Sequence, residues 1–242
     1  MKKILGILIA ILALMFSGSV VNAEDTDASK TISIMVRYEN SEVRTISEDA
    51  EIIGDDIELI DVVTTDIDLY KNNVGVKYVE EDVKVEKSTL SDDWYIDFDN
   101  INEVYTDLSY RGKNVKIAIL DSGISFCNGK QLSGGINIID NSENYGDDNG
   151  HGTSMANIVA SIAPEAEFYS VKILDSNGEG YYSNVIEGIN WAIENDMDII
   201  CMSFGAYNYS YFLEEAINNA FNAGIAMIAA SVNDASHKMH YP

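Results

Sequence analysis

Cysteine and positive charge are both scarce in this chain of 242 residues. The two cysteines, Cys127 and Cys201, are too few for a disulfide framework or a cysteine metal cluster. Cys201 lies in an apolar run, which indicates a small core residue. Lys and Arg together number 15 against 40 Asp and Glu, a formal net charge of −25. Because so acidic a chain repels phosphate backbones, we expect no nucleic-acid partner.

Long apolar runs are also rare, and the only one lies at the N-terminus. Lys2 and Lys3 precede ILGILIAILALMF (4–16), and a small polar stretch then ends in Val-Asn-Ala at 21–23. This order is typical of a secretory signal peptide over residues 1–23. A membrane anchor is the alternative, but the run is shorter than the ~20 residues of a spanning helix. We therefore expect a secreted protein with no stable membrane span after cleavage.

The following region, residues 24–90, has the pattern of a small α+β domain. Three of its segments are strand-like because apolar residues alternate with polar ones or β-branched residues dominate: 31–38, 57–70 and 74–86. A domain of this size is marginal on its own core. Residues 87–100 are polar and acidic, which predicts an exposed connector where proteolytic cleavage is favoured.

Beyond residue 110 the chain alternates apolar strands with amphipathic helices. The predicted strands are 115–120, 167–174, 198–204 and 225–231. One helix is expected from a Ser183 cap to Glu194, and another from a Ser210 cap to Gly224. This order predicts an α/β fold over residues 91–242: a parallel sheet with right-handed crossovers and helices on both faces.

Three polar residues fall where function gathers in such sheets, at the carboxyl ends of strands. Asp121 follows one strand, His151 begins a helix-like run, and Asn233 follows the last strand. A buried carboxylate fixes an imidazole as a general base, and a rigid amide donates to an oxyanion. Each also has a plain structural interpretation: a turn residue, a capping or surface histidine, and a loop residue.

The amino-acid sequences around these residues make the assignment more specific. VKIAILDSGI, NGHGTSMANIVASIAPEAEFYSVKIL and GIAMIAASVND resemble the aspartate, histidine and oxyanion segments of subtilisin-like serine proteases. SNGEGYYSNVIEGINWAIENDMDIICMSFG resembles the stretch that lines their substrate cleft. The resemblance extends from about residue 94 to the end, and VGVKYVEEDV resembles the end of the family's propeptide. It therefore implies a subtilisin-like peptidase domain preceded by a propeptide that serves as folding template and inhibitor.

The resemblance assigns roles residue by residue. It implies that Asp121 orients the base His151 and that Asn233 donates to the oxyanion. It also implies substrate-binding residues, which are Ser203, Phe204, Gly205, Gly178 and Gly180. The implied partners are a peptide or protein substrate and the chain's own propeptide, with maturation cleavage at 87–93.

The nucleophile is the open part of this assignment. GTSMA (152–156) mimics the family's serine motif, but Ser154 lies only three residues past His151, so a carbonyl it attacked would not be presented to that base. Ser236 is too close to the oxyanion segment. We expect the serine to lie beyond Pro242, so that the chain as written is inactive. The alternatives are a pseudoprotease that binds peptides or its own propeptide, and a truncated product that does not fold stably.

No cofactor is expected, and calcium binding remains open without a clear site. The acidic loop DNSENYGDD (140–148) lacks the glycine and closing glutamate of an EF-hand loop. A solvated acidic loop is the preferred interpretation. The tight-calcium loop of many family members is not apparent, and Val232 stands where a glycine usually precedes the oxyanion asparagine.

Overall fold

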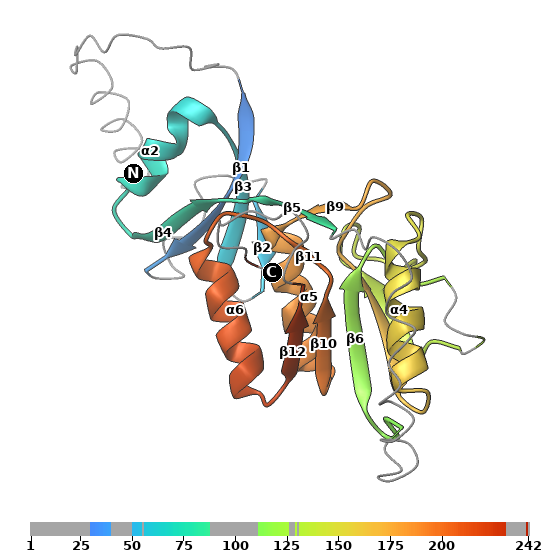
Figure 1. Ribbon diagram of the computed structural model, residues 1–242. Helices are drawn as coiled ribbons and strands as arrows, with labels where there is room; N and C mark the ends of the chain where they lie inside the picture. The colour runs from blue at the N-terminus through green and yellow to red at the C-terminus, as the bar shows by residue number, and fades with distance from the viewer. Residues whose placement is uncertain are drawn as a thin grey trace, which may run out of the picture.

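The computed structural model consists of a small N-terminal unit docked on a larger α/β unit (Figure 1). It describes residues 30–39, 50–54, 56–87, 111–125, 129, 131–230 and 241. In this part of the chain, no helix is long and apolar enough to cross a membrane.

The N-terminal unit is an antiparallel sheet in the order β2-β3-β1-β4. Its strands are β1 (Thr31–Tyr38), β2 (Glu51–Ile53), β3 (Ile57–Val63) and β4 (Val76–Glu81). Alternate residues of the two central strands form a small core with Ile34, Val36, Ile60 and Val62. The domain is thus built on the period-2 pattern of its sequence.

The predicted strand over 57–70 is wrong in its second half. The chain turns at Thr64 into η2 (Thr64–Asp66) and α2 (Ile67–Lys71). Both the hydroxyl and the amide of Thr64 donate to the Lys30 carbonyl, which ends the strand pairing. Ile67 and Tyr70, three residues apart, then pack together against the small core, as helical spacing requires.

The larger unit is built on a parallel sheet of five strands in the order β12-β10-β6-β8-β7. They are β6 (Lys116–Asp121), β7 (Gly134–Asn137), β8 (Glu167–Lys172), β10 (Ile199–Met202) and β12 (Ala226–Ala229). The predicted α/β class is confirmed, with one strand, β7, that the sequence analysis did not anticipate.

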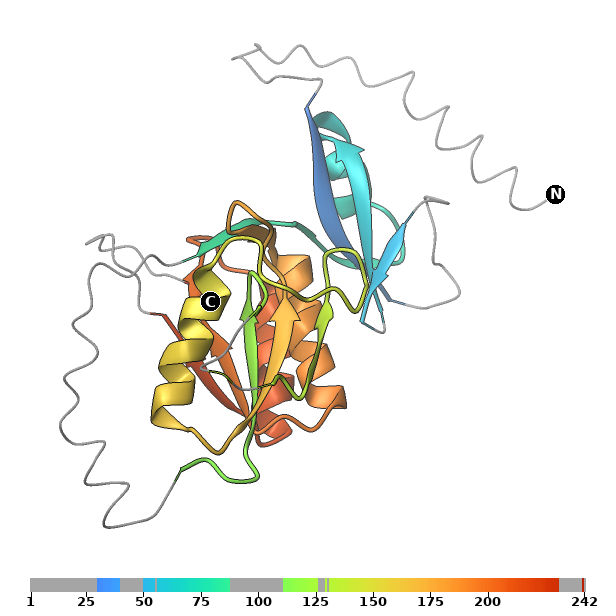
Figure 2. The same ribbon diagram turned by 90° about the vertical axis from the view of Figure 1, so that its right-hand side faces the viewer.

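Helices cover both faces of this sheet, as Figure 2 shows. Ile117 and Ile119 of β6 pack on the side of α4 (His151–Ile162). Ala118 and Leu120 point the other way, into the main core with α5 (Tyr182–Glu194) and α6 (Tyr211–Asn222). The unbroken apolar run of β6 follows from this burial on both faces.

A third sheet joins the two units. Its strands, in the order β11-β5-β9, are β11 (Phe204–Gly205), β5 (Lys84–Lys87) and β9 (Glu179–Tyr181). Strand β5 continues the N-terminal unit in sequence but pairs antiparallel with two strands of the larger unit. The predicted boundary at residue 90 therefore follows a strand that already lies on the larger unit.

The beginnings of α5 and α6 bear on how the units dock. Ser210 precedes α6 as predicted, and its hydroxyl accepts from the Leu213 amide at 3.0 Å. Ser183 does not cap α5, because the helix begins one residue earlier, at Tyr182. The amide and hydroxyl of Ser183 instead donate to Asp82 of the N-terminal unit. The predicted Ser183 cap was therefore wrong.

Candidate active site

Asp121 and His151 meet at the carboxyl end of the parallel sheet. Asp121 is the last residue of β6 and is 0% exposed, and His151 is the first residue of α4 and is 9% exposed. The His151 Nδ1 atom lies 2.8 Å from Asp121 Oδ1 and 3.0 Å from Oδ2. Because a carboxylate only accepts, Nδ1 carries the proton and Nε2 is left as the basic nitrogen.

Two glycines allow this close approach. A Cβ at Gly152 would lie 2.2 Å from the Gly123 carbonyl oxygen and 3.1 Å from Asp121 Cβ. Gly123 itself has a φ of 103° and a virtual Cβ 2.6 Å from the Gly146 carbonyl oxygen. The start of α4 therefore packs directly on the backbone that follows Asp121, which only residues without a side chain permit.

The helix that carries His151 receives its cap from Asp147, three residues before its N-cap. Gly150, the N-cap, has a φ of 96° and makes no side-chain bond of its own. The Asp147 carboxylate accepts from the amides of Asn149, Gly150 and Thr153, and from the hydroxyls of Thr153 and Ser122. Burial opposes ionisation, but these bonds outweigh it and hold the pKa of Asp147 below its usual value.

Ser122 connects this cap to the Asp121 carboxylate. Its amide donates to Asp121 Oδ1 at 2.7 Å, and its hydroxyl donates to Asp147 and accepts from the Gly152 amide at 3.0 Å. One residue thus contacts both the strand end and the helix start.

A buried lysine reinforces the same corner. Lys172, the last residue of β8, is only 4% exposed. Its Nζ donates to the carbonyls of Ser122 and Leu174 at 2.7 and 2.9 Å, and pairs with Asp148 at 2.6 Å. The ends of β6 and β8 and the loop before α4 are therefore fastened to a single ammonium group.

Most of the loop 140–148 is exposed, as its interpretation as a solvated acidic loop predicts, but two of its carboxylates have specific partners. Asp147 and Asp148 are bound to the cap and to Lys172, whereas Asp140 at the start of the loop is exposed. Among the described residues, no group of three or more His, Cys, Asp or Glu is arranged to hold a metal ion. Burial raises the pKa of the Cys201 thiol to about 11.

Of the remaining candidate residues, the structure describes Ser154 but not Asn233. The Ser154 hydroxyl donates to the Gly150 carbonyl at 2.9 Å, one helical turn back, on an exposed part of α4. Asn233 lies outside the described residues, and so do Cys127 and Ser236.

The predicted substrate-binding residues lie along β5. Phe204 is paired with Lys87 and Gly205 with Glu86, and Ser203 immediately precedes them. On the other side, the Gly178 carbonyl accepts from the Lys87 amide at 3.0 Å, and Gly180 is paired with Val85. The chain's own segment therefore runs between the two predicted walls as an added strand.

Positions 178 and 180 exclude a side chain for different reasons. A Cβ at Gly178 would lie 2.6 Å from Lys87 Cδ, so the lysine stem rests on this glycine. A Cβ at Gly180 would instead lie 2.3 Å from the Ile173 carbonyl oxygen. Gly180 thus lets β9 pack against its own domain, and not against the bound segment.

Two carboxylates of the N-terminal unit sit at helix N-termini of the larger unit. Asp82 accepts from the amide and hydroxyl of Ser183 at 2.9 and 2.6 Å. Burial raises the pKa of Asp82 to about 6; the bonds from Ser183 oppose this, and the charges of Glu80 and Glu51 add to it. Glu80 accepts from the Ser210 hydroxyl and from the amides of Tyr211 and Phe212 at the start of α6.

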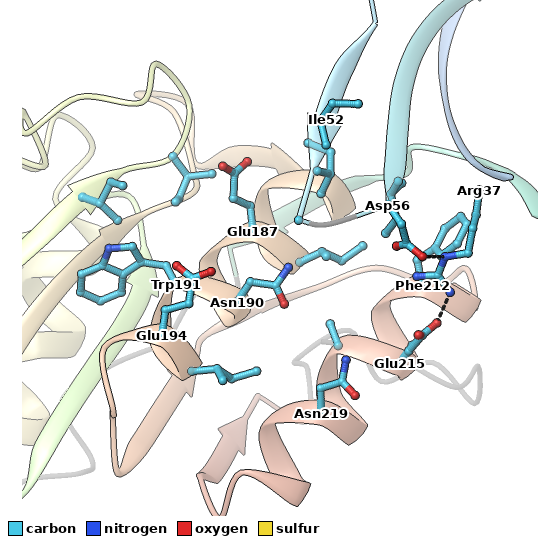
Figure 3. Close-up of a pocket in the computed structure, with 18 of the residues that line it drawn as sticks. Arg37, Ile52, Asp56, Glu187, Asn190, Trp191, Glu194, Phe212, Glu215 and Asn219 are labelled. Carbon is cyan, nitrogen blue, oxygen red and sulfur yellow. Dashed lines mark hydrogen bonds and ion pairs between the residues drawn. The ribbon is translucent and has the colours of Figure 1, made fainter. Parts of the chain in front are cut away.

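A further contact between the units borders a cavity of about 750 Å³, drawn in Figure 3. Arg37 of β1 pairs with Asp56 at 3.0 Å and with Glu215 of α6 at 2.5 Å, and lies over the Phe212 ring. The cavity is walled by the N-terminal unit, α5 and α6, and none of the predicted site residues lines it.

Sequence comparisons agree with this arrangement. The model of the Subtilase family matches residues 112–242, which include Asp121 and His151. The chain belongs to the subtilase family. It is 43% identical over 141 residues to the minor extracellular protease Epr of Bacillus subtilis, covering 54% of this chain and 22% of that protein.

Two other subtilases align over more of the chain. A thermostable alkaline protease of Halalkalibacterium halodurans is 33% identical over 235 residues, or 91% of this chain and 64% of the relative. An alkaline protease of Alkalihalobacillus alcalophilus is 30% identical over 278 residues, or 100% and 72%. The chain thus spans between 22% and 72% of the length of these three relatives.

The residues that support the Asp121–His151 pair were not predicted from the sequence. Asp147 was part of a charge run, and Ser122 was only a turn residue beside Asp121. Lys172 gave one usable signal, because a lysine within the apolar strand EFYSVKIL must find partners if it is buried. Asn149, which contacts Lys87, gave none.

Proposed function

We propose that the protein is a serine endopeptidase with an Asp-His-Ser triad, made as a precursor and secreted. The observation that carries the proposal is the 2.8 Å contact between His151 Nδ1 and the fully buried carboxylate of Asp121. The names of the relatives, alkaline and extracellular proteases, support the reaction class and the extracellular location. Residues 1–23 are the proposed signal peptide, and no cofactor is invoked.

In the proposed mechanism, His151 Nε2 takes the proton of a serine hydroxyl as that oxygen attacks a peptide carbonyl. Asp121 holds the Nδ1 proton and stabilises the imidazolium that forms. Asn233 donates to the oxyanion, and the imidazolium then protonates the leaving amine. Water hydrolyses the acyl-enzyme by the same proton transfers. The nucleophilic serine is not among the described residues.

The N-terminal unit is proposed to be the propeptide and the inhibitor of this site. Its strand β5 pairs with both β9 and β11, where an extended substrate is expected to bind. Asp82 and Glu80 bind the N-termini of α5 and α6 and hold the unit in place. Maturation then requires cleavage in the segment after Lys87, at the proposed site between residues 87 and 93.

The test is peptide hydrolysis and fluorophosphonate labelling of the protein expressed from its complete reading frame. We expect both, and we expect His151→Ala and Asp121→Asn to lower kcat by about 10³-fold or more. Asp140→Asn, a charge change at an exposed residue of the acidic loop, serves as the control. Hydrolysis that survives His151→Ala, or labelling at Ser154, would contradict the proposal.

A second candidate is a pseudoprotease that binds peptides or its own propeptide without cutting them. It is favoured by the seating of β5 in the cleft, which needs no chemistry. Retained peptide binding with neither labelling nor hydrolysis would select this candidate.

A further inference from the structure

The strand β5 gives a direct view of how the cleft treats individual side chains. Its backbone pairs with β9 and β11 whatever its side chains are, so these bonds provide affinity without selectivity. Selectivity must come from the surroundings of each side chain. The four residues Lys84–Lys87 differ sharply in this respect.

Lys87 lies in the most specific surroundings. Its stem rests on Gly178, where a Cβ would be 2.6 Å from Lys87 Cδ. Its Nζ donates to Asn149 Oδ1 at 2.7 Å. A residue larger than glycine at position 178 would displace the lysine stem. A side chain too short to reach from Gly178 to Asn149 would lose the hydrogen bond to Asn149.

Asn149 is oriented so that it offers an acceptor and not a donor. Its Nδ2 donates to the Ser176 carbonyl at 2.8 Å, which directs Oδ1 toward Lys87. Its amide donates to Asp147, so the residue is also fixed through its backbone. Turning the side-chain amide over would lose the Ser176 bond and point a donor at any ligand. The position is therefore built for a donor at the end of a long side chain.

The charge of the chain also favours a cation at this position. Asp147 is two residues before Asn149 and accepts from its backbone amide. The chain as a whole carries a net charge of −25. Such an acidic protein attracts a positive side chain and disfavours an acidic one.

The other positions set the rest of the pattern. Val85 is fully buried in the main core, which fits a small β-branched side chain. Lys84 pairs with Glu179 at 2.6 Å, but both side chains are substantially exposed, so this pair contributes little selectivity.

We propose that the substrate cleft selects extended peptides that carry a lysine or arginine where Lys87 lies, two residues after a small β-branched residue. Asn149 and Gly178 are the specificity-determining residues for the basic side chain. The inference rests on the proposed function in one respect, namely that substrates bind where β5 does.

The first test uses amide hydrogen exchange in the full chain, which needs no hydrolysis. Lys87→Met keeps the length of the side chain and removes its charge and donors. We expect the Lys87-position amide, bonded to Gly178, to exchange about tenfold faster in Lys87→Met and at nearly the original rate in Lys87→Arg. Lys84→Met, in the same strand, is the matched control and should change exchange by less than about threefold.

Asn149→Leu tests whether the effect passes through the assigned partner. In this background, Lys87→Met should no longer accelerate exchange, because the acceptor is already gone. Unchanged exchange in Lys87→Met, or an equal acceleration with and without Asn149, would overturn the inference.

The second test compares kcat/KM for two peptides that differ only by Lys or Met at this position, with the protein from its complete reading frame. A preference of about tenfold for Lys is expected. Equal values would overturn the inference while the proposed function stands. Hydrolysis of neither peptide, with the exchange pattern intact, would remove the proposed function and leave a cleft that selects basic peptides.

Discussion

The helices α4, α5 and α6 of the larger unit obtain their N-terminal caps from different parts of the chain. The cap of α4 comes from its own loop, through Asp147. The start of α5 is bound by its own Asn184, which accepts from the Tyr181 amide, and by Asp82. The start of α6 is bound by its own Ser210 and by Glu80. Helix α4 is thus capped within the larger unit alone, while α5 and α6 also use carboxylates of the N-terminal unit.

This difference separates a helix start that is complete within the larger unit from two that also use the N-terminal unit. A helix N-terminus has amides that need acceptors and a positive end of its dipole. For α4 these needs are met whether or not the N-terminal unit is present. For α5 and α6 they are met in part by carboxylates of the N-terminal unit, so these contacts contribute to docking.

The largest effect is expected for Asp147→Asn. An asparagine side chain has one oxygen that accepts and one nitrogen that only donates, whereas both carboxylate oxygens of Asp147 accept. The charge-assisted bonds to Thr153, Gly150 or Asn149 are therefore lost or weakened. We expect the free energy of unfolding in urea to fall by about 4 kcal/mol. Asp140→Asn, which is exposed in the same loop, is the control. The internal cap would be unimportant if the two variants unfolded alike.

The next effect is the pH dependence of docking through Asp82. Its pKa is about 6 when docked and 3.8 ordinarily, so the docked state binds this proton more tightly. The contribution of this carboxyl to stability is therefore complete below pH 4 and is lost as the pH rises through 6, a change of about 3 kcal/mol.

Urea unfolding of the full chain between pH 4 and pH 7 measures this change. Asp82→Asn, which keeps the shape and does not titrate, should flatten the profile by the same amount. A profile that keeps its slope in Asp82→Asn would show that other groups carry the pH dependence.

The smallest effect is expected for Glu80→Gln. The substitution removes the charge at the start of α6 but keeps an oxygen for the Tyr211 amide, and Ser210 still caps Leu213. We expect a loss of about 1 kcal/mol, measured as for Asp147→Asn. If this loss equalled that of Asp147→Asn, the distinction between internal and external caps would fail.

The sequence predicted the larger fold well because burial on both faces leaves a strong signal. The apolar runs of β6, β8, β10 and β12 appear within two residues of their expected positions. The strand expected over 57–70 is wrong after Val63. Ile67 and Tyr70, three residues apart, already indicate a helix, because residues at that spacing lie on opposite faces of a strand. The chain leaves the strand at Thr64, which bonds to Lys30. That contact joins residues far apart in sequence.

The contact between Asp121 and His151 was predictable, because one residue ends a strand and the other begins a helix at the same edge of the sheet. Their catalytic roles stay a prediction. Ser183 was misread because its true acceptor, Asp82, is 101 residues away. Asp147 and Lys172 depend in the same way on which loops meet in space, so their roles appear only once the sheet order is known.

The seating of β5 has a kinetic consequence. The segment is held by pairing with two strands and by the helix-end contacts of Asp82 and Glu80, none of which depends on a continuous backbone after Lys87. If the N-terminal unit is the propeptide that we propose, cleavage after Lys87 alone would not free the cleft, because the cleaved unit stays bound until it dissociates. In a progress curve, this dissociation would appear as a lag whose length depends little on dilution, because dissociation is a first-order step.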